Sequence, residues 1–288
     1  MHPEVQYLNL ARQVIRNGVK TVGRNGTTYT SIGAMMRFPL NNGTIPLLTT
    51  KKLAWRSCLK ELFWFMRGET DNKKLQNQNV KIWNGNASRE FLDSRNLHHL
   101  EENDLGPVYG HQWRFYDAEY TNSKEDYKGK GIDQLQNIVD ELQSNNKTSR
   151  RLIMTAWNPN QIDEMALPPC HVLSQFHVTN DDELSVTLYQ RSGDIGLGIP
   201  FNIASYSFLT HIIAKHCDLK AKEFVHFIGN AHVYDDHATS LIRQAVRNPK
   251  QFPTIQVNKR NTLEEYDISD IEIKNYNYHE PIKMDMRV

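Results

Sequence analysis

The sequence predicts an α+β fold, in which helices and strands mix without a regular strand–helix–strand alternation. Amphipathic helical patterns dominate the first half of the chain, and β-prone segments become frequent in the second half. We find no internal repeat, low-complexity tract or clear linker. Residues 1–288 are therefore expected to form a single domain.

Three helices are expected in the first half of the chain. Residues 4–17, 57–67 and 134–142 each place apolar side chains at helical spacing on one face. Glycines directly follow the first two segments and mark their ends. Polar clusters, at residues 23–28 and 122–131, separate these helices.

The second half is richer in strand patterns. Residues 172–179 and 184–190 flank the turn residues 180–182, and the alternation in the second segment predicts a β-hairpin. Residues 203–213 are apolar nearly all round, which predicts a buried helix. The remaining expected elements are a short apolar run at 151–157, strands at 223–228, 254–258 and 271–276, and a helix at 235–247.

Charge and cysteine content limit the class of protein. The 34 basic and 33 acidic residues nearly cancel, so nucleic acid is not expected as the main partner. We expect no signal peptide and no membrane span, because no long apolar run occurs. The three cysteines suit a reducing, cytoplasmic or nuclear location, and Cys58 and Cys217 are expected to be packing residues.

The segment LPPCH places Cys170 after Pro168 and Pro169, whose rings fix the backbone ahead of one thiol. Nearby cations would favour a reactive thiolate, and arginine side chains also bind phosphate. A phosphorylated substrate attacked by sulfur is one interpretation, and a buried strand cysteine is the other. The candidate cations are Arg150, Arg151 and Arg191.

The segment QRSGDIGLGIPFNIASYS is dense in polar residues and glycines. Gly193, Gly196 and Gly198 would let a ligand approach the backbone closely. Asn202 offers one donor and one acceptor to a heterocyclic ring, although asparagine is equally suited to a helix N-cap. The glycine spacing does not match a dinucleotide-binding motif.

Three further side chains could take part in chemistry. Glu61 lies in a largely apolar stretch, where burial would raise its pKa and suit proton transfer, unless it lies on a solvated helix face. His232 and Tyr234 alternate along an extended segment and should face the same side. They could bind a sugar hydroxyl or pack in the core.

The residue pattern argues against two other types of site. His226, His232 and His237 lack the short spacing of metal ligands and there is no CxxC pair, so no metal is expected. A papain-like hydrolase could be assembled from Cys170, a histidine and Asn202. The residues around the cysteine do not match the local signature of that family.

Taken together, LPPCH, YQRSGDIGLGIPFNIASY, GNAHVY and DLGPVYGHQWR closely resemble the thymidylate synthase family. The resemblance continues through PLLTTKK, ELFWFMRG, KIWNGNASREFLDS and AWNP to the ending IKMDMRV. It implies the thymidylate synthase-like fold, with a large mixed β-sheet packed with helices. It also implies a symmetric homodimer that forms through the sheet.

The resemblance implies that dUMP and 5,10-methylenetetrahydrofolate give dTMP and dihydrofolate, without a metal. The Cys170 thiolate would add to carbon 6 of uracil and make carbon 5 nucleophilic, and the folate would supply both carbon and hydride. The sequence shows no reductase domain, so another protein is expected to recycle dihydrofolate. A dUMP hydroxymethylase on the same scaffold and an RNA-binding regulator are the rival functions.

The family motifs imply roles for individual residues. The catalytic residues would be Cys170, Glu61, Tyr109, His171 and Asn202. The residues binding dUMP would be Arg24, Gln190, Arg191, Ser192, Asp194, Asn202, His232 and Tyr234, with Arg150 and Arg151 reaching in from the partner subunit. The folate site would comprise Lys51 at the glutamate tail, Asp194 at the pterin, Val288 as a closing lid, and Ile82, Trp83, Leu197, Gly198 and Phe201 along the pocket.

Several positions bear on specificity. Asn202 favours uracil, since relatives that act on dCMP carry aspartate at the matching position. Asn84 and Asn230 replace acidic residues that are common in the family, and Ala54 replaces a larger ring. These departures put folate affinity in question more than the type of reaction.

Overall fold

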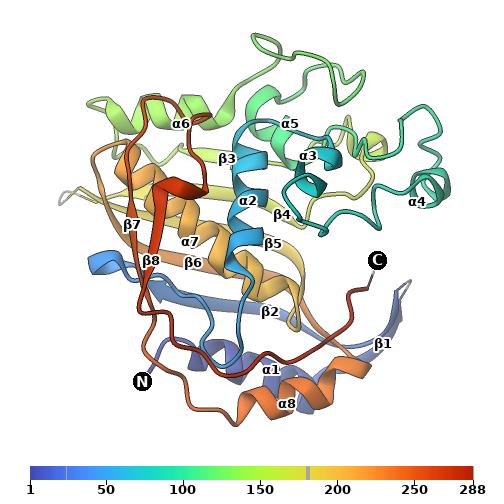
Figure 1. Ribbon diagram of the computed structural model, residues 1–288, viewed down its shortest axis with the longest axis vertical. Helices are drawn as coiled ribbons and strands as arrows, with labels where there is room; N and C mark the ends of the chain where they lie inside the picture. The colour runs from blue at the N-terminus through green and yellow to red at the C-terminus, as the bar shows by residue number, and fades with distance from the viewer. Residues whose placement is uncertain (24, 180–181, 288) are drawn as a thin grey trace.

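A computed structural model describes residues 1–23, 25–179 and 182–287 (Figure 1). A six-stranded sheet has the order β1-β2-β6-β5-β4-β3, and its β5–β6 pair is parallel whereas the other neighbouring pairs are antiparallel. The large mixed sheet of the prediction is thus confirmed. Its strands are β1 (Val19–Gly23), β2 (Gly26–Pro39), β3 (Ile153–Thr155), β4 (His171–Val178), β5 (Glu183–Asp194) and β6 (Lys220–Tyr234). A separate antiparallel pair comprises β7 (Thr254–Val257) and β8 (Ile271–Lys274).

Helices α2 and α7 cross in front of the sheet in Figure 1. Helix α7 also carries the chain from β5 to its parallel neighbour β6, as a parallel pair requires. The helices are α1 (Val5–Asn17), α2 (Trp55–Met66), α3 (Asn72–Gln76), α4 (Arg89–Ser94), α5 (Tyr109–Phe115), α6 (Gln134–Gln143), α7 (Gly198–His216) and α8 (Ala238–Ala245). Short 3₁₀ turns occur at Asn41–Gly43, Ile162–Glu164, Asp235–His237 and Ile268–Asp270.

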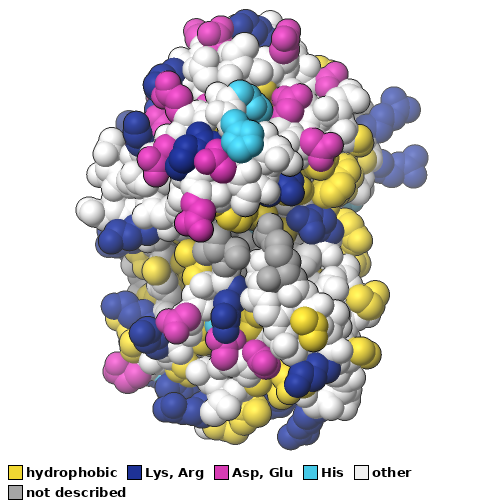
Figure 2. Space-filling model, turned by 90° about the vertical axis from the view of Figure 1, so that its right-hand side faces the viewer, with side chains coloured by type: hydrophobic (Ala, Val, Ile, Leu, Met, Phe, Trp, Pro, Cys, Tyr) yellow, Lys and Arg dark blue, Asp and Glu magenta, His cyan; other side chains and the backbone are white. Residues whose placement is uncertain are grey.

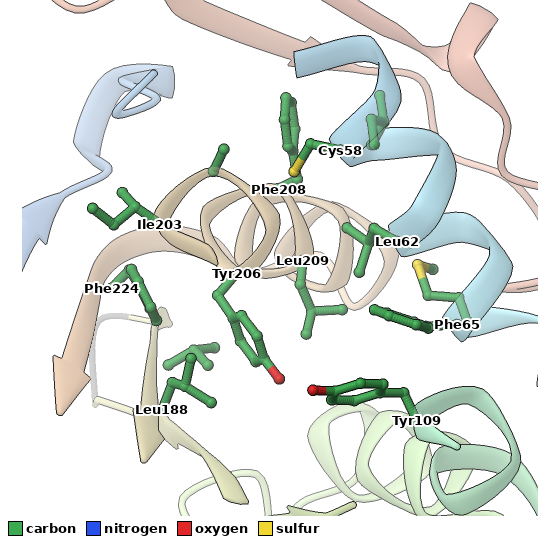
Figure 3. Close-up of a cluster of buried hydrophobic side chains, with 14 of the residues drawn as sticks. Cys58, Leu62, Phe65, Tyr109, Leu188, Ile203, Tyr206, Phe208, Leu209 and Phe224 are labelled. Atoms are coloured by element: carbon green, nitrogen blue, oxygen red, sulfur yellow. The ribbon is translucent and has the colours of Figure 1, made fainter. Parts of the chain in front are cut away.

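The core lies between the sheet and these helices. In Figure 3, side chains of α2 and α7 meet side chains of β5 and β6, and Tyr109 of α5 points into the same region. Apolar residues on nearly every face of α7 explain why this helix is central rather than amphipathic. This packing fixes the start of α7 and the ends of β5 and β6 relative to one another.

The other face of the sheet exposes large apolar side chains. Ile32 and Met35 on β2, Tyr189 on β5 and Phe227 on β6 are between 43% and 75% exposed. Tyr189 and Met35 are both ladder partners of Phe227, so three of these side chains form one row across the sheet. A shallow, open depression of about 480 Å³ lies among them.

Most of the expected elements are found near their predicted bounds. The hairpin is confirmed by β4 and β5, which pair as far as Val178 and Leu184, although turn residues 180–181 lie outside the described residues. The polar cluster 23–28 lies between α1 and α2 as expected, and Gly23 of β1 pairs with Gly26 of β2 within it, whereas Arg24 lies outside the described residues. Within the described residues, no helix is long and apolar enough to cross a membrane.

Candidate active site

The site is built where the two parallel strands end. Ser192 pairs with Asn230 and Asp194 pairs with His232, so the last residues of β5 and β6 lie side by side where these two strands end. The rings of His232 and Tyr234 are 5.5 Å apart and perpendicular, which confirms that they face the same side. Figure 2, which faces the side of the molecule where β1 and the C-terminal segment lie, shows a hollow across its middle.

Cys170 lies directly before β4, and neighbouring groups hold its backbone at both ends. Its N–H donates to the hydroxyl of Tyr109 at 2.7 Å, and its carbonyl accepts from the Arg191 N–H at 2.9 Å. The Arg191 guanidinium donates to the carbonyls of Pro169 and Pro168 at 2.9 and 2.8 Å. The half-buried thiol is thus placed by an arginine and a tyrosine from different elements.

Burial dominates the electrostatics of this thiol. It raises the pKa of Cys170, whereas the positive charge of Arg191 and the hydroxyl of Tyr109 act to lower it. Arg150 and Arg151 are exposed on the loop before β3. In the described part of this single chain burial outweighs Arg191, so the expected stabilisation of a thiolate by cations stays a prediction that also depends on Arg150 and Arg151.

Hydrogen bonds connect the buried His226 and Gln190 to the half-buried Asn202. The His226 ring bonds to Gln190 Oε1 at 2.8 Å, and Gln190 Nε2 donates to Asn202 Oδ1 at 2.8 Å. Asn202 lies inside α7, whose N-cap is Leu197, so the N-cap interpretation of Asn202 is wrong. Burial lowers the pKa of His171 to about 4, against a weaker effect of its bond to Asn202, so this imidazole is neutral near pH 7.

Glu61 and Trp83 were expected in different parts of the site, but they form one unit. The indole Nε1 of Trp83 donates to Glu61 Oε1 at 2.7 Å. Burial raises the pKa of Glu61 to about 7, and the indole bond opposes this rise. The solvated-face alternative for Glu61 is therefore wrong. The Trp83 ring lies 6.0 Å from the Tyr109 ring, which links this unit to the cysteine.

Asp194 closes a tight turn at the end of β5. Its two carboxylate oxygens accept the N–H groups of Gly196 and Leu197 at 2.8 and 3.1 Å. Burial would raise its pKa, but His237 and these backbone N–H groups outweigh burial and keep the pKa lowered. Asp194 therefore presents a carboxylate at the edge of the sheet.

Gly198, the first residue of α7, lies beside Asp194, since a Cβ at position 198 would stand 3.8 Å from the Asp194 Cβ. The other residues expected along the folate pocket are the buried Trp83 and the half-buried Ile82, Leu197 and Phe201. A carboxylate can accept from the N–H groups of a heterocycle and apolar side chains suit its flat faces, so these residue types fit a pterin. Cys58 donates to the carbonyl of Phe201 and is buried, in keeping with a packing role.

Two of the expected site residues, Arg24 and Val288, lie outside the described residues. Lys51 is buried and donates to the carbonyl of Gly196 at 2.5 Å, so in this structure its ammonium group is directed inward. Half-buried Ser192 lies on β5 beside Asn230, whose side chain lies 3.3 Å from the His232 ring.

The other two departures from the family pattern are Asn84 and Ala54. Asn84 accepts amide hydrogen bonds from Asn72 and Gln76, so it is held in a network of amides. Ala54 is exposed at the N-cap of α2. In residues 1–23, 25–179 and 182–287, no three His, Cys, Asp or Glu side chains gather as a metal site would require.

Two further residues lie at this site: the sequence pattern assigned no role to Tyr206, and His237 was weighed only as a metal ligand. The buried Tyr206 of α7 points its hydroxyl toward that of Tyr109 in Figure 3, and its ring lies 5.2 Å from His171. His237 lies 3.9 Å from Asp194 and bonds to the carbonyl of Asp285 at 2.8 Å. The family motifs quoted above end just short of His237. Tyr206 lies within one of them, but its pattern is that of a core residue.

Comparison with known proteins decides the family. The family model described as "Thymidylate synthase" matches residues 5–288. The chain belongs to the thymidylate synthase family. It is 48% identical over 289 residues to "Thymidylate synthase 1/2" of Encephalitozoon cuniculi, covering 99% of this chain and 97% of that protein.

Other relatives in the thymidylate synthase family are longer than this chain. The chain is 52% identical over 287 residues to "Bifunctional dihydrofolate reductase-thymidylate synthase" of Plasmodium berghei, covering 99% of this chain and 48% of that protein. A similarly named protein of Zea mays is 49% identical over 289 residues, covering 100% of this chain and 55% of the relative. The chain thus spans about half the length of these bifunctional relatives.

Proposed function

We propose that residues 1–288 form one thymidylate synthase catalytic domain, which converts dUMP to dTMP with 5,10-methylenetetrahydrofolate and releases dihydrofolate. The proposal is supported by the match of the family model to residues 5–288 and by one feature of the site above all. The Cys170 loop is bonded to Arg191, and Arg191 shares β5 with Gln190, which bonds the amide of Asn202. The proposed nucleophile Cys170, the phosphate ligand Arg191 and the uracil-binding amide of Asn202 are therefore held in fixed positions relative to one another.

Cys170 acts as the nucleophile. Its sulfur forms a bond to carbon 6 of uracil, and the electrons of the ring double bond move toward carbon 5 and the carbonyl oxygen at position 4. Glu61, whose pKa is about 7, can both give and take a proton near that oxygen through water. The bound methylenetetrahydrofolate supplies the one-carbon unit and the hydride.

The remaining side chains bind and orient the substrates. Arg191 and Ser192, together with Arg24, bind the dUMP phosphate, and Asn202 binds the uracil edge. His232 and Tyr234 bind the 3′-hydroxyl from the end of β6. Tyr109 assists removal of the proton on carbon 5, and its hydroxyl is already fixed by the Cys170 N–H at 2.7 Å.

The exposed face of the sheet is the proposed dimer interface. Ile32, Met35, Tyr189 and Phe227 form an apolar surface that would be costly to leave in water, and two copies of the chain can cover it symmetrically. Exposed Arg150 and Arg151 would then reach the phosphate site of the partner subunit and lower the pKa of its Cys170. A Phe227→Asp variant should sediment as a monomer with greatly reduced activity, and an active dimeric variant would contradict this assembly.

We also propose a cytoplasmic or nuclear location. It is supported by the three unpaired cysteines, two of them buried, which suit a reducing compartment.

The reaction is tested by following dihydrofolate formation spectrophotometrically with purified protein, dUMP and methylenetetrahydrofolate. A rise in dihydrofolate absorbance that tracks dTMP formation one to one is expected. Formation of 5-hydroxymethyl-dUMP without dihydrofolate would show a hydroxymethylase instead. Replacing dUMP with dCMP is the matched control, and it should give no product.

A further inference from the structure

We propose that Lys51 is a positioning residue, which holds the Asp194 turn in the geometry that binds the pterin. The inference rests on the proposed function and deepens it. Lys51 would set the affinity for the folate ring without touching the distal glutamates of the folate.

The link from Lys51 to the carboxylate passes through a single peptide unit. The Lys51 ammonium donates to the carbonyl of Gly196 at 2.5 Å. The same peptide carries the N–H of Leu197, which donates to Asp194 Oδ2 at 3.1 Å. A cation bonded to a peptide carbonyl polarises that peptide and strengthens the hydrogen bond of its N–H. Lys51 therefore acts on the orientation and charge of Asp194 across one amide.

The inward direction of Lys51 is fixed by the residues before it. Thr49 and Thr50 donate their backbone N–H groups to the buried Glu4 carboxylate at 2.9 and 2.8 Å, and both hydroxyls donate to it at 2.6 Å. Glu4 thus bonds two consecutive residues at four points. Because the chain is held this way up to Thr50, the side chain of Lys51 leaves the segment in a defined direction.

A second buried group supports the same turn from α1. The Tyr7 hydroxyl donates to the carbonyl of Ile195 at 2.9 Å, while the Ile195 N–H donates to the carbonyl of His232 at 2.9 Å. Both carbonyls of the turn residues 195 and 196 are thereby bonded to side chains from distant parts of the chain. Such convergence is typical of residues that must be held within a narrow geometry.

A direct contact with the glutamate tail of folate is the competing role for Lys51. Lys51 is only 5% exposed, and its ammonium already donates to Gly196. The next residue, Lys52, is exposed and carries the same charge, so it offers a matched control. The two roles predict different results for the folate KM of a Lys51 variant. A contact with the tail predicts a loss that depends on the number of glutamates, and a positioning role predicts the same loss for every number.

The test compares Lys51→Met with Lys52→Met, using methylenetetrahydrofolate with one and with five glutamates. For Lys51→Met we expect the KM for the monoglutamate to rise about tenfold, with kcat reduced less than about threefold. The same factor is expected for the pentaglutamate. Lys52→Met should leave the monoglutamate KM within about twofold of wild type.

A second variant tests the same turn in case Lys51→Met does not fold. Tyr7→Phe keeps the buried ring and removes the hydroxyl that donates to Ile195, and it should raise the folate KM about threefold for both forms of the folate. Calorimetric titration with dUMP alone checks that each variant retains its nucleotide site. An unchanged monoglutamate KM in Lys51→Met, or a loss that appears only with the pentaglutamate, would overturn the positioning role. Wild-type protein that forms no dihydrofolate would instead overturn the proposed function.

Discussion

Replacing Trp83 with phenylalanine removes one hydrogen bond and keeps an aromatic ring between Glu61 and Tyr109. The lost bond joins the indole Nε1 to Glu61 Oε1 at 2.7 Å. A hydrogen bond to an ionised group contributes about 1.5–3 kcal/mol, and each pKa unit corresponds to about 1.4 kcal/mol. Because the bond stabilises the carboxylate, its loss should raise the pKa of Glu61 by about one unit from its present value of about 7.

At pH 7 the ionised fraction of Glu61 would then fall from about one half to about one tenth. The assay is kcat/KM for dUMP measured from about pH 5.5 to 9, where the limb belonging to Glu61 should move about one unit toward higher pH. Trp55→Phe is the matched control, since Trp55 lies on α2, the helix that carries Glu61, but contacts Phe208. If the Trp83→Phe profile superimposes on that of wild type, the proposed coupling of Trp83 to Glu61 is refuted.

Three other substitutions test separate parts of the site. Glu61→Gln should be more stable than wild type by roughly 3 kcal/mol at pH 8 and no more stable at pH 4. The reason is that the pKa of Glu61 is about 7 in the folded protein and 4.5 in the unfolded chain, so ionisation favours the unfolded chain. Equal melting-temperature differences at the two pH values would contradict this. Tyr109→Phe removes the acceptor of the Cys170 N–H and should lower kcat about 100-fold while calorimetry shows dUMP affinity within a few-fold of wild type; unchanged kcat would count against the role of the hydroxyl. Gln190→Leu frees the amide of Asn202 and should reduce the kcat/KM preference for dUMP over dCMP about tenfold, whereas retained preference would show that Gln190 does not orient it.

The sequence was most informative where the residue types allow few local conformations or environments. Two prolines ahead of Cys170 indicated a fixed backbone, and the structure shows their carbonyls bonded by Arg191. The apolar stretch around Glu61 indicated a raised pKa, and burial indeed raises it. Alternation predicted that His232 and Tyr234 share a side, because strand geometry leaves no other arrangement.

Other features depend on contacts between distant segments, which local patterns do not encode. β1 is exposed along its length, so its sequence lacks the apolar alternation of a half-buried strand. The inward direction of Lys51 follows from Glu4 and Gly196, which are far from it in sequence. The pKa of Cys170 likewise depends on how deeply its loop is buried and on the position of Arg191, which the sequence does not show.

Covalent attack by Cys170 is the central claim, and mass spectrometry of the intact protein tests it most directly. Incubation with 5-fluoro-dUMP and methylenetetrahydrofolate should trap an adduct, because fluorine at carbon 5 cannot leave as the proton does. We predict a mass increase equal to nucleotide plus folate, located on the peptide containing Cys170, and no increase in Cys170→Ala. An unmodified wild-type mass, or an adduct on another residue, would contradict the account.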